Sequence, residues 1–163
     1  RDLVRSRGLG DVYKRQVINR IDHAQSGAVM AFRILDKLGM PADEIATVCS
    51  AIGNHDESTA FPVNAVAAAL ILADKTDVRR TRVRNRDKAT FDIHDRVNYA
   101  VEKASTTLDA AGKAVVLDLQ LDTGMSPVID YFEIFLERML LCRKAAEKLG
   151  LSFRLVVNGQ TVL

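Results

Sequence analysis

The sequence predicts a mainly helical protein that ends in a small α+β unit. Between residues 23 and 108 the apolar side chains recur at the three- and four-residue spacing of amphipathic helices. From residue 115 to residue 121 they alternate with polar side chains, as in a half-buried strand. A long helix and a short hairpin are predicted to follow this strand.

The composition narrows the class of protein. Hydrophobic residues make up 48% of the chain and charged residues 27%, and no apolar run is long enough to span a bilayer. The net charge of +2 is too small for the whole chain to bind polyanions through charge alone. Cys49 and Cys142 lie on apolar helix faces without a paired spacing, so we expect reduced thiols and a cytoplasmic location.

Residues 1–16 do not resemble the beginning of a domain. They are basic, poor in apolar residues and without helical or strand periodicity. The ending Asp11-Val12-Tyr13-Lys14-Arg15-Gln16 resembles a translated sequencing-library adapter. We therefore expect a non-native segment, after which the protein resumes at Val17 without its natural N-terminus. A disordered basic tail is the alternative.

The first helices are predicted from His23 to Leu38, where Gly39 suits a left-handed C-cap, and from Pro41 to about His55. The apolar stripe of the first contains Val29, Phe32, Leu35 and Leu38, and the buried face of the second contains Ile45, Val48, Cys49 and Ile52.

A third helix, starting at Val63, is apolar on nearly all sides until Asp74, which predicts that it crosses the middle of a helical bundle. Asp92 is predicted to cap a fourth helix, from Ile93 to about Leu108. Gly112 then ends a helical domain of residues 17–112.

Residues 113–163 are predicted to form the α+β unit. The strand at 115–121 precedes a helix that begins near Pro127 and is stopped by Gly150. Asn158-Gly159, between two apolar runs, is a strong signal for a two-residue hairpin turn. We expect a three-stranded antiparallel layer crossed by one helix.

Three predicted helix termini carry residues of the kind that bind metals. His55 and Asp56 follow the second helix, Asp74 ends the third, and His23 begins the first. Imidazole and carboxylate groups are ligands for divalent iron, manganese, zinc or magnesium.

Three short motifs carry a resemblance to a known family. His23-Ala24-Gln25-Ser26-Gly27, Gly53-Asn54-His55-Asp56-Glu57 and Leu72-Ala73-Asp74-Lys75 resemble the later motifs of the HD superfamily of metal-dependent phosphohydrolases, with spacing closest to the HD-GYP-like branch. The resemblance implies an HD-like helical bundle, metal ligands at His23, His55 and Asp74, and one or two ions. The family's His-Asp dyad would lie just before Val17, so we expect this chain to bind metal weakly and to turn over little.

A second alignment of the motifs takes His55-Asp56 as the dyad, His23 as the first histidine and Asp95 as the last carboxylate. It makes Asp56 a secondary metal ligand. It fits less well because small apolar residues should follow the dyad, whereas Glu57 follows here.

The resemblance also implies hydrolysis of a phosphomonoester or a nucleotide in a bacterial-type cytoplasmic enzyme. Lys75 and Asp77 are the catalytic candidates, and Arg79, Arg80 and Arg82 are the candidates for phosphate binding. These arginines belong to a run of five between positions 79 and 86.

Other interpretations stay open. The arginine run is also typical of a solvated surface paired with nearby aspartates. It could bind nucleic acid, but no aromatic residues interleave it, which disfavours that reading. The domain could instead be a catalytically inactive ligand-sensing or interaction module. A homodimer could form through the C-terminal sheet edge or the long helix.

Overall fold

The computed structural model describes residues 22–57 and 59–163, so the expectations for residues 1–16 and for Val17 fall outside the described residues. The chain divides into two compact units, Arg1–Leu70 and Ile71–Leu163. The division falls within helix α4 (Ala65–Lys75). We call these the N-terminal and the C-terminal unit and describe each by itself.

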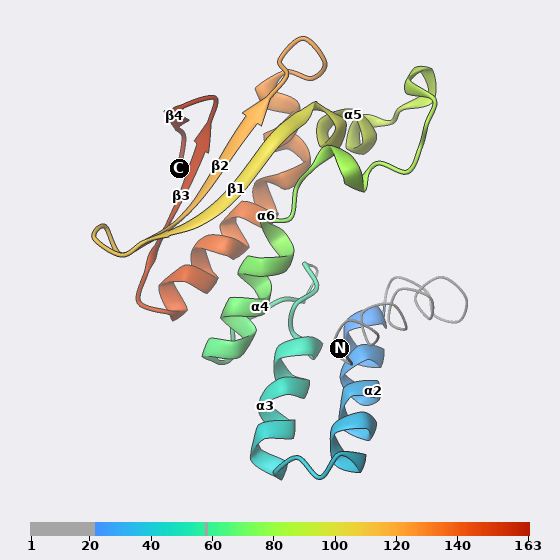
Figure 1. Cartoon of the computed structure of the whole chain (residues 1–163), viewed down its shortest axis with the longest axis vertical. Helices are drawn as coiled ribbons and strands as arrows, with labels where there is room; N and C mark the ends of the chain where they lie inside the picture. The colour runs from blue at the N-terminus through green and yellow to red at the C-terminus, as the bar shows by residue number, and fades with distance from the viewer. Residues whose placement is uncertain (1–21, 58) are drawn as a thin grey trace. The chain divides into compact units, whose positions relative to one another are not determined.

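The N-terminal unit contains a helical hairpin of α2 (His23–Lys37) and α3 (Ala42–Gly53), which Figure 1 shows side by side. Gly39 follows α2 with a positive φ of 72°, which confirms the predicted left-handed cap. The two helices pack through small residues. A Cβ at Gly27 would lie 3.2 Å from Ile52 Cγ2, and the Cys49 thiol donates to the carbonyl of Ala28 at 3.4 Å.

This close packing changes which residues the hairpin covers. Ala24 and Ile45 are buried, whereas much of the apolar stripe of α2 is exposed: Val29 is 57% exposed, Phe32 52% and Leu38 75%. On α3, Ile45 is buried as predicted, while Val48, Cys49 and Ile52 are only half-buried. Small residues bring the helix axes together, so the larger side chains are displaced to the flanks.

The C-terminal unit is built on a four-stranded sheet in the order β1-β2-β3-β4. Its strands are β1 (Val101–Asp109), β2 (Ala114–Leu121), β3 (Ser152–Val157) and β4 (Gln160–Thr161). Pairs β1–β2 and β3–β4 are antiparallel, and β2–β3 is parallel. The parallel pair requires a crossover, and α6 (Val128–Lys148) provides it by crossing one face of the sheet (Figure 1).

The core of this unit lies between α6 and the sheet. Its largest fully buried side chains include Leu117, Leu119 and Leu155 from the strands and Tyr131 and Met139 from α6. The Tyr131 hydroxyl donates to the Met139 sulfur at 3.5 Å, which satisfies the polar end of a buried ring.

The α+β class of the C-terminal half is confirmed. The described chain is α+β and not the mainly helical bundle that the sequence predicted. Two further details of the prediction are wrong. The sheet is four-stranded and mixed, not three-stranded and antiparallel. The predicted helix to Leu108 stops at Ala100, because α5 (Ile93–Ala100) leads directly into β1. Residues 101–109 pair with β2, and this long-range pairing outweighs their helical spacing.

Several local predictions are confirmed. The carboxylate of Asp92 accepts from the Asp95 amide at 2.7 Å and caps α5. Gly150 follows α6 with a φ of 71°, and Asn158 and Gly159 form the hairpin turn with φ values of 50° and 80°.

Between α4 and α5 the chain forms two short 3₁₀ helices, η2 (Arg80–Arg82) and η3 (Lys88–Thr90). Helix α4 is not buried on all sides, because the Val66 side chain is 47% exposed. In the described part of the chain, no helix combines the length and the apolar character needed to cross a membrane.

Candidate functional site

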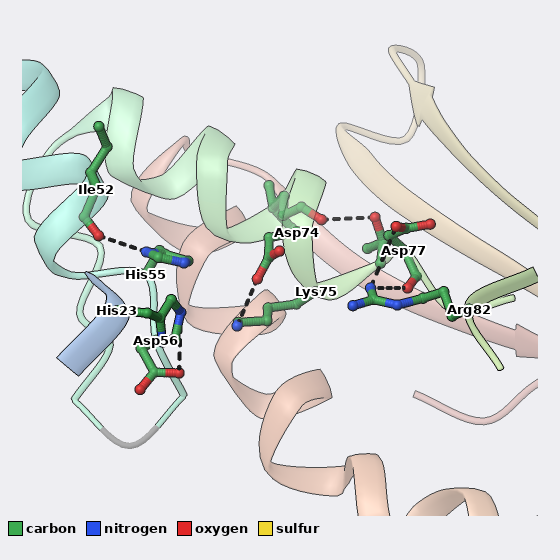
Figure 2. Close-up of polar contacts among 10 residues, drawn as sticks. His23, Ile52, His55, Asp56, Asp74, Lys75, Asp77 and Arg82 are labelled. Carbon is green, nitrogen blue, oxygen red and sulfur yellow. Dashed lines mark hydrogen bonds and ion pairs between the residues drawn. The ribbon is translucent and has the colours of Figure 1, made fainter. Parts of the chain in front are cut away.

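Two of the three predicted metal ligands lie together in the N-terminal unit. The rings of His23 and His55 meet edge to face, with their centroids 5.1 Å apart (Figure 2). His23 is the first residue of α2, and His55 comes just after the end of α3. The hairpin places the start of one helix beside the end of the other, so the two imidazoles meet at its open end.

The ring of His55 is held by the helix that precedes it. Its Nδ1 lies 2.6 Å from the carbonyl oxygen of Ile52. A carbonyl oxygen only accepts hydrogen bonds, so Nδ1 carries the proton and the lone pair of the neutral ring lies on Nε2. Metal-binding histidines commonly have this arrangement, in which one ring nitrogen donates to a carbonyl and the other binds the ion.

Asp56 places a carboxylate next to the same pair. Its Oδ1 lies 4.0 Å from His23 Nε2, and the side chains of His23 and Asp56 are 21% and 24% exposed. This separation is too long for a hydrogen bond between these two atoms. The open end of the hairpin thus gathers two imidazoles and one carboxylate, which are donors that divalent transition metals accept.

The donor chemistry fits a metal, but the described residues do not close a ligand set. Within residues 22–57 and 59–163, no three His, Cys, Asp or Glu side chains are arranged so that they could hold an ion. The third predicted ligand, Asp74, belongs to the C-terminal unit. Its convergence with His23 and His55 therefore stays a prediction.

Asp74 and Lys75 end helix α4 and pair with each other. Lys75 Nζ lies 2.7 Å from Asp74 Oδ2, with the lysine side chain 6% exposed and the aspartate side chain 42% exposed (Figure 2). The apolar run that precedes them explains this placement, because α4 carries the lysine stem into a buried position while the carboxylate reaches solvent.

Asp77, the other catalytic candidate, is engaged by the arginine run. Its carboxylate lies 2.6 Å from Arg79 Nε and 3.4 Å from Arg82 Nη1. Arg82 also donates to the Asp77 backbone carbonyl at 2.8 Å. These contacts anchor the segment after α4.

Arg80 points to α5 and the start of β1. Its Nε donates to the Tyr99 carbonyl at 2.7 Å, and its guanidinium lies 4.5 Å from the centre of the Tyr99 ring. Its Nη2 lies 3.7 Å from Glu102 Oε1. All three phosphate-binding candidates thus have partners within their own unit. The pairing agrees with the surface interpretation of this run, and a phosphate-binding role stays a prediction.

The sheet carries a pocket that the sequence did not predict. On the helix-free face, a pocket of about 440 Å³ is lined mainly by polar side chains. They are Glu102, Lys103, Ser105, Asp118, Gln120 and Asn158. The signal was present in β2, where Asp118 and Gln120 alternate with the buried leucines. This alternation did not predict the pocket, because the pocket also needs side chains of β1, and residues 101–108 were predicted to be helical.

No family model, curated protein or solved structure matches the chain. The resemblance to the HD superfamily therefore rests on its sequence motifs.

Proposed function

We propose that this chain is part of a metal-dependent phosphohydrolase of the HD kind, in which His23 and His55 are two of the metal ligands and the substrate is a phosphomonoester or a nucleotide. The observation that carries the proposal is the edge-to-face imidazole pair, with the His55 tautomer fixed by the Ile52 carbonyl. Both features agree with a ligand pair, in which a carbonyl orients one ring and leaves its second nitrogen for the ion.

In this proposal, one set of residues binds the metal and another binds the phosphate. A divalent ion bound at the imidazoles would supply a hydroxide near neutral pH. The chain itself would orient the His55 ring through Ile52 and add carboxylate ligands from Asp56 or Asp74. Lys75 and the arginines at 79, 80 and 82 would bind the anionic oxygens of the phosphate, after exchanging their present partners. Imidazole and carboxylate together suit iron, manganese or zinc, and a carboxylate-rich set would suit magnesium.

We place this activity in the cytoplasm, since neither cysteine forms a disulfide. A ligand-sensing module without turnover is the second candidate. The observation in its favour is that Asp77 and the arginines at 79, 80 and 82 are already engaged with each other or with neighbouring residues.

The test is elemental analysis of the purified chain after loading with iron, manganese, zinc or magnesium. We expect His23→Ala and His55→Ala to lower the bound metal, because each removes one imidazole donor. His94→Ala is the matched control, as it removes the third histidine of the chain from an exposed position on α5. Equal metal content in all of these proteins would refute the ligand assignment.

Asp74→Asn and Asp95→Asn distinguish the two alignments of the motifs. Loss of metal in Asp74→Asn supports the first, and loss in Asp95→Asn supports the second. A panel of phosphomonoesters and nucleotides then separates enzyme from sensor. Metal-dependent hydrolysis that falls in His55→Ala supports the enzyme, and metal binding without hydrolysis supports the sensor.

A further inference from the structure

Strand β1 leaves the longer edge of the sheet open. It pairs with β2 alone, and among the described residues no backbone hydrogen bond joins positions 103–109 to any other segment. The opposite edge is formed by the short β4 and the residues after it, which run on along β3. There the Leu155 amide donates to the Leu163 carbonyl at 2.9 Å. An open edge of this kind is a template for another strand.

Two features that can hinder such pairing, a bulge and the charged Lys103, lie at one end of β1, and the rest of the strand has no bulge and no lysine. Its register with β2 is irregular only between Val101 and Lys103, and from there to Asp109 the strand is regular and without proline. Leu108 is 65% exposed, and Thr106 and Thr107 are also exposed. β-Branched and apolar residues in an exposed edge strand favour pairing with a further strand.

The sequence of this stretch is complementary to itself. In an antiparallel pair with a twofold axis through Thr106, position 103 lies opposite 109, 104 opposite 108, and 105 opposite 107. Lys103 then faces the partner's Asp109, and Ala104 faces the partner's Leu108. Opposed residues of antiparallel strands point to the same face, so both contacts are between side chains that can meet.

Neighbouring registers lose this match. An axis through Ser105 places Lys103 opposite Thr107 and Glu102 opposite Leu108. An axis through Thr107 places Asp109 opposite Ser105. Only the axis through Thr106 pairs the two charged ends of the stretch and gives Leu108 an apolar neighbour.

We propose that β1 pairs with β1 of a second copy of this chain, antiparallel and centred on Thr106, so that one continuous sheet runs through both copies. Two Lys103–Asp109 contacts close the interface at its ends. The charge complementarity of the strand with itself selects a second copy as the occupant, in preference to a strand of unrelated sequence.

The oligomeric state of the full chain tests this proposal. Sedimentation and light scattering are expected to show a monomer–dimer equilibrium, with slower hydrogen exchange of the β1 amides as the protein concentration rises. Lys103→Asp and Asp109→Lys each replace two attractive contacts with two repulsive ones. We expect either variant to raise the dimer dissociation constant on the order of tenfold or more. Lys144→Asp, a charge reversal on the exposed side of α6, should leave it unchanged.

Mixing the two variants supplies the decisive result. A heterodimer of Lys103→Asp with Asp109→Lys has two restored opposite-charge contacts, so it should form at concentrations where each variant alone is monomeric. This result also shows that both variants fold, although Asp109→Lys loses the contacts of Asp109 with Arg154 and the Gly112 amide. A monomer at every concentration would leave the edge to a strand from another protein and would overturn the proposal. Dimers that ignore both charge reversals would overturn it as well.

Discussion

Tyr99 is contacted by two cations of the segment between α4 and α5. The Arg80 guanidinium and the Lys88 ammonium lie 4.5 and 4.6 Å from the centre of its ring, and the Phe91 ring packs against it at 5.3 Å. The hydrogen bond from Lys88 lowers the pKa of the Tyr99 phenol, and the positive charges of Lys88 and Arg80 act in the same direction. The ionised form of this tyrosine is therefore favoured by folding.

This environment predicts an early tyrosine ionisation. In a spectrophotometric titration, we expect Tyr99 to form tyrosinate below the ordinary phenol pKa of 10.0. Its contribution to stability is fully present above that pH and is lost as the pH falls through the lowered pKa. Lys88→Met should move the transition back toward higher pH, and Tyr99→Phe should abolish it. An unchanged titration in Lys88→Met would contradict the assignment.

Tyr131 serves as the internal comparison. Burial raises the pKa of its hydroxyl, with a further contribution from Cys142. Folding favours the neutral phenol here, so this contribution to stability is fully present below the ordinary phenol pKa and is lost as the pH rises above it. Tyr131 should thus ionise only together with alkaline unfolding.

At the level of elements, the β3–β4 turn also ties β2 to the end of β3. The Asn158 side chain accepts from the Leu121 amide at 2.8 Å and donates to the Leu121 carbonyl at 3.1 Å. The Asn158 backbone has a φ of 50°, a conformation that asparagine tolerates better than most residues. One side chain therefore satisfies the strand end and permits the turn.

We expect Asn158→Ala to lower the free energy of unfolding by about 1–3 kcal/mol, because it leaves the Leu121 backbone groups without their partners. Urea denaturation measures the effect. Asn158→Asp is the matched control, since it keeps the acceptor for the Leu121 amide and loses only the donor, and its cost should be smaller. Equal stability of wild type and Asn158→Ala would show that the two hydrogen bonds between Asn158 and Leu121 do not stabilise the fold.

At the level of the whole molecule, the two units bury different kinds of side chain. The N-terminal unit buries mostly small residues in its described part, with Ile45 as the largest. The C-terminal unit buries Tyr131, Leu117 and Met139 among others. Burial of large apolar side chains is the main stabilising contribution to a fold. We therefore expect the C-terminal unit to be more stable than the N-terminal unit.

Native-state hydrogen exchange tests this difference. We expect the amides of β2, β3 and α6 to exchange slowly and those of α2 and α3 to exchange much faster, through local opening. Metal added at saturating concentration should slow exchange around His23 and His55 if they are ligands. Uniform protection of both units without metal would contradict the expected order.

The sequence by itself determined the features that depend on neighbouring residues. Gly39 and Gly150 end their helices, Asp92 caps α5, and Asn158-Gly159 makes the turn, because each acts through its own backbone conformation or through a hydrogen bond within a few residues. The sequence also marked His23 and His55 as a pair, through motif spacing.

Only the tertiary structure decided the features that depend on distant partners. Residues 101–109 became a strand because β2 offered a matching edge, and β2 and β3 became parallel because α6 crosses between them. The edge-to-face contact of His23 with His55 required the α2–α3 hairpin. The free energy of such contacts lies in long-range pairing and packing, which a local pattern of residues does not contain.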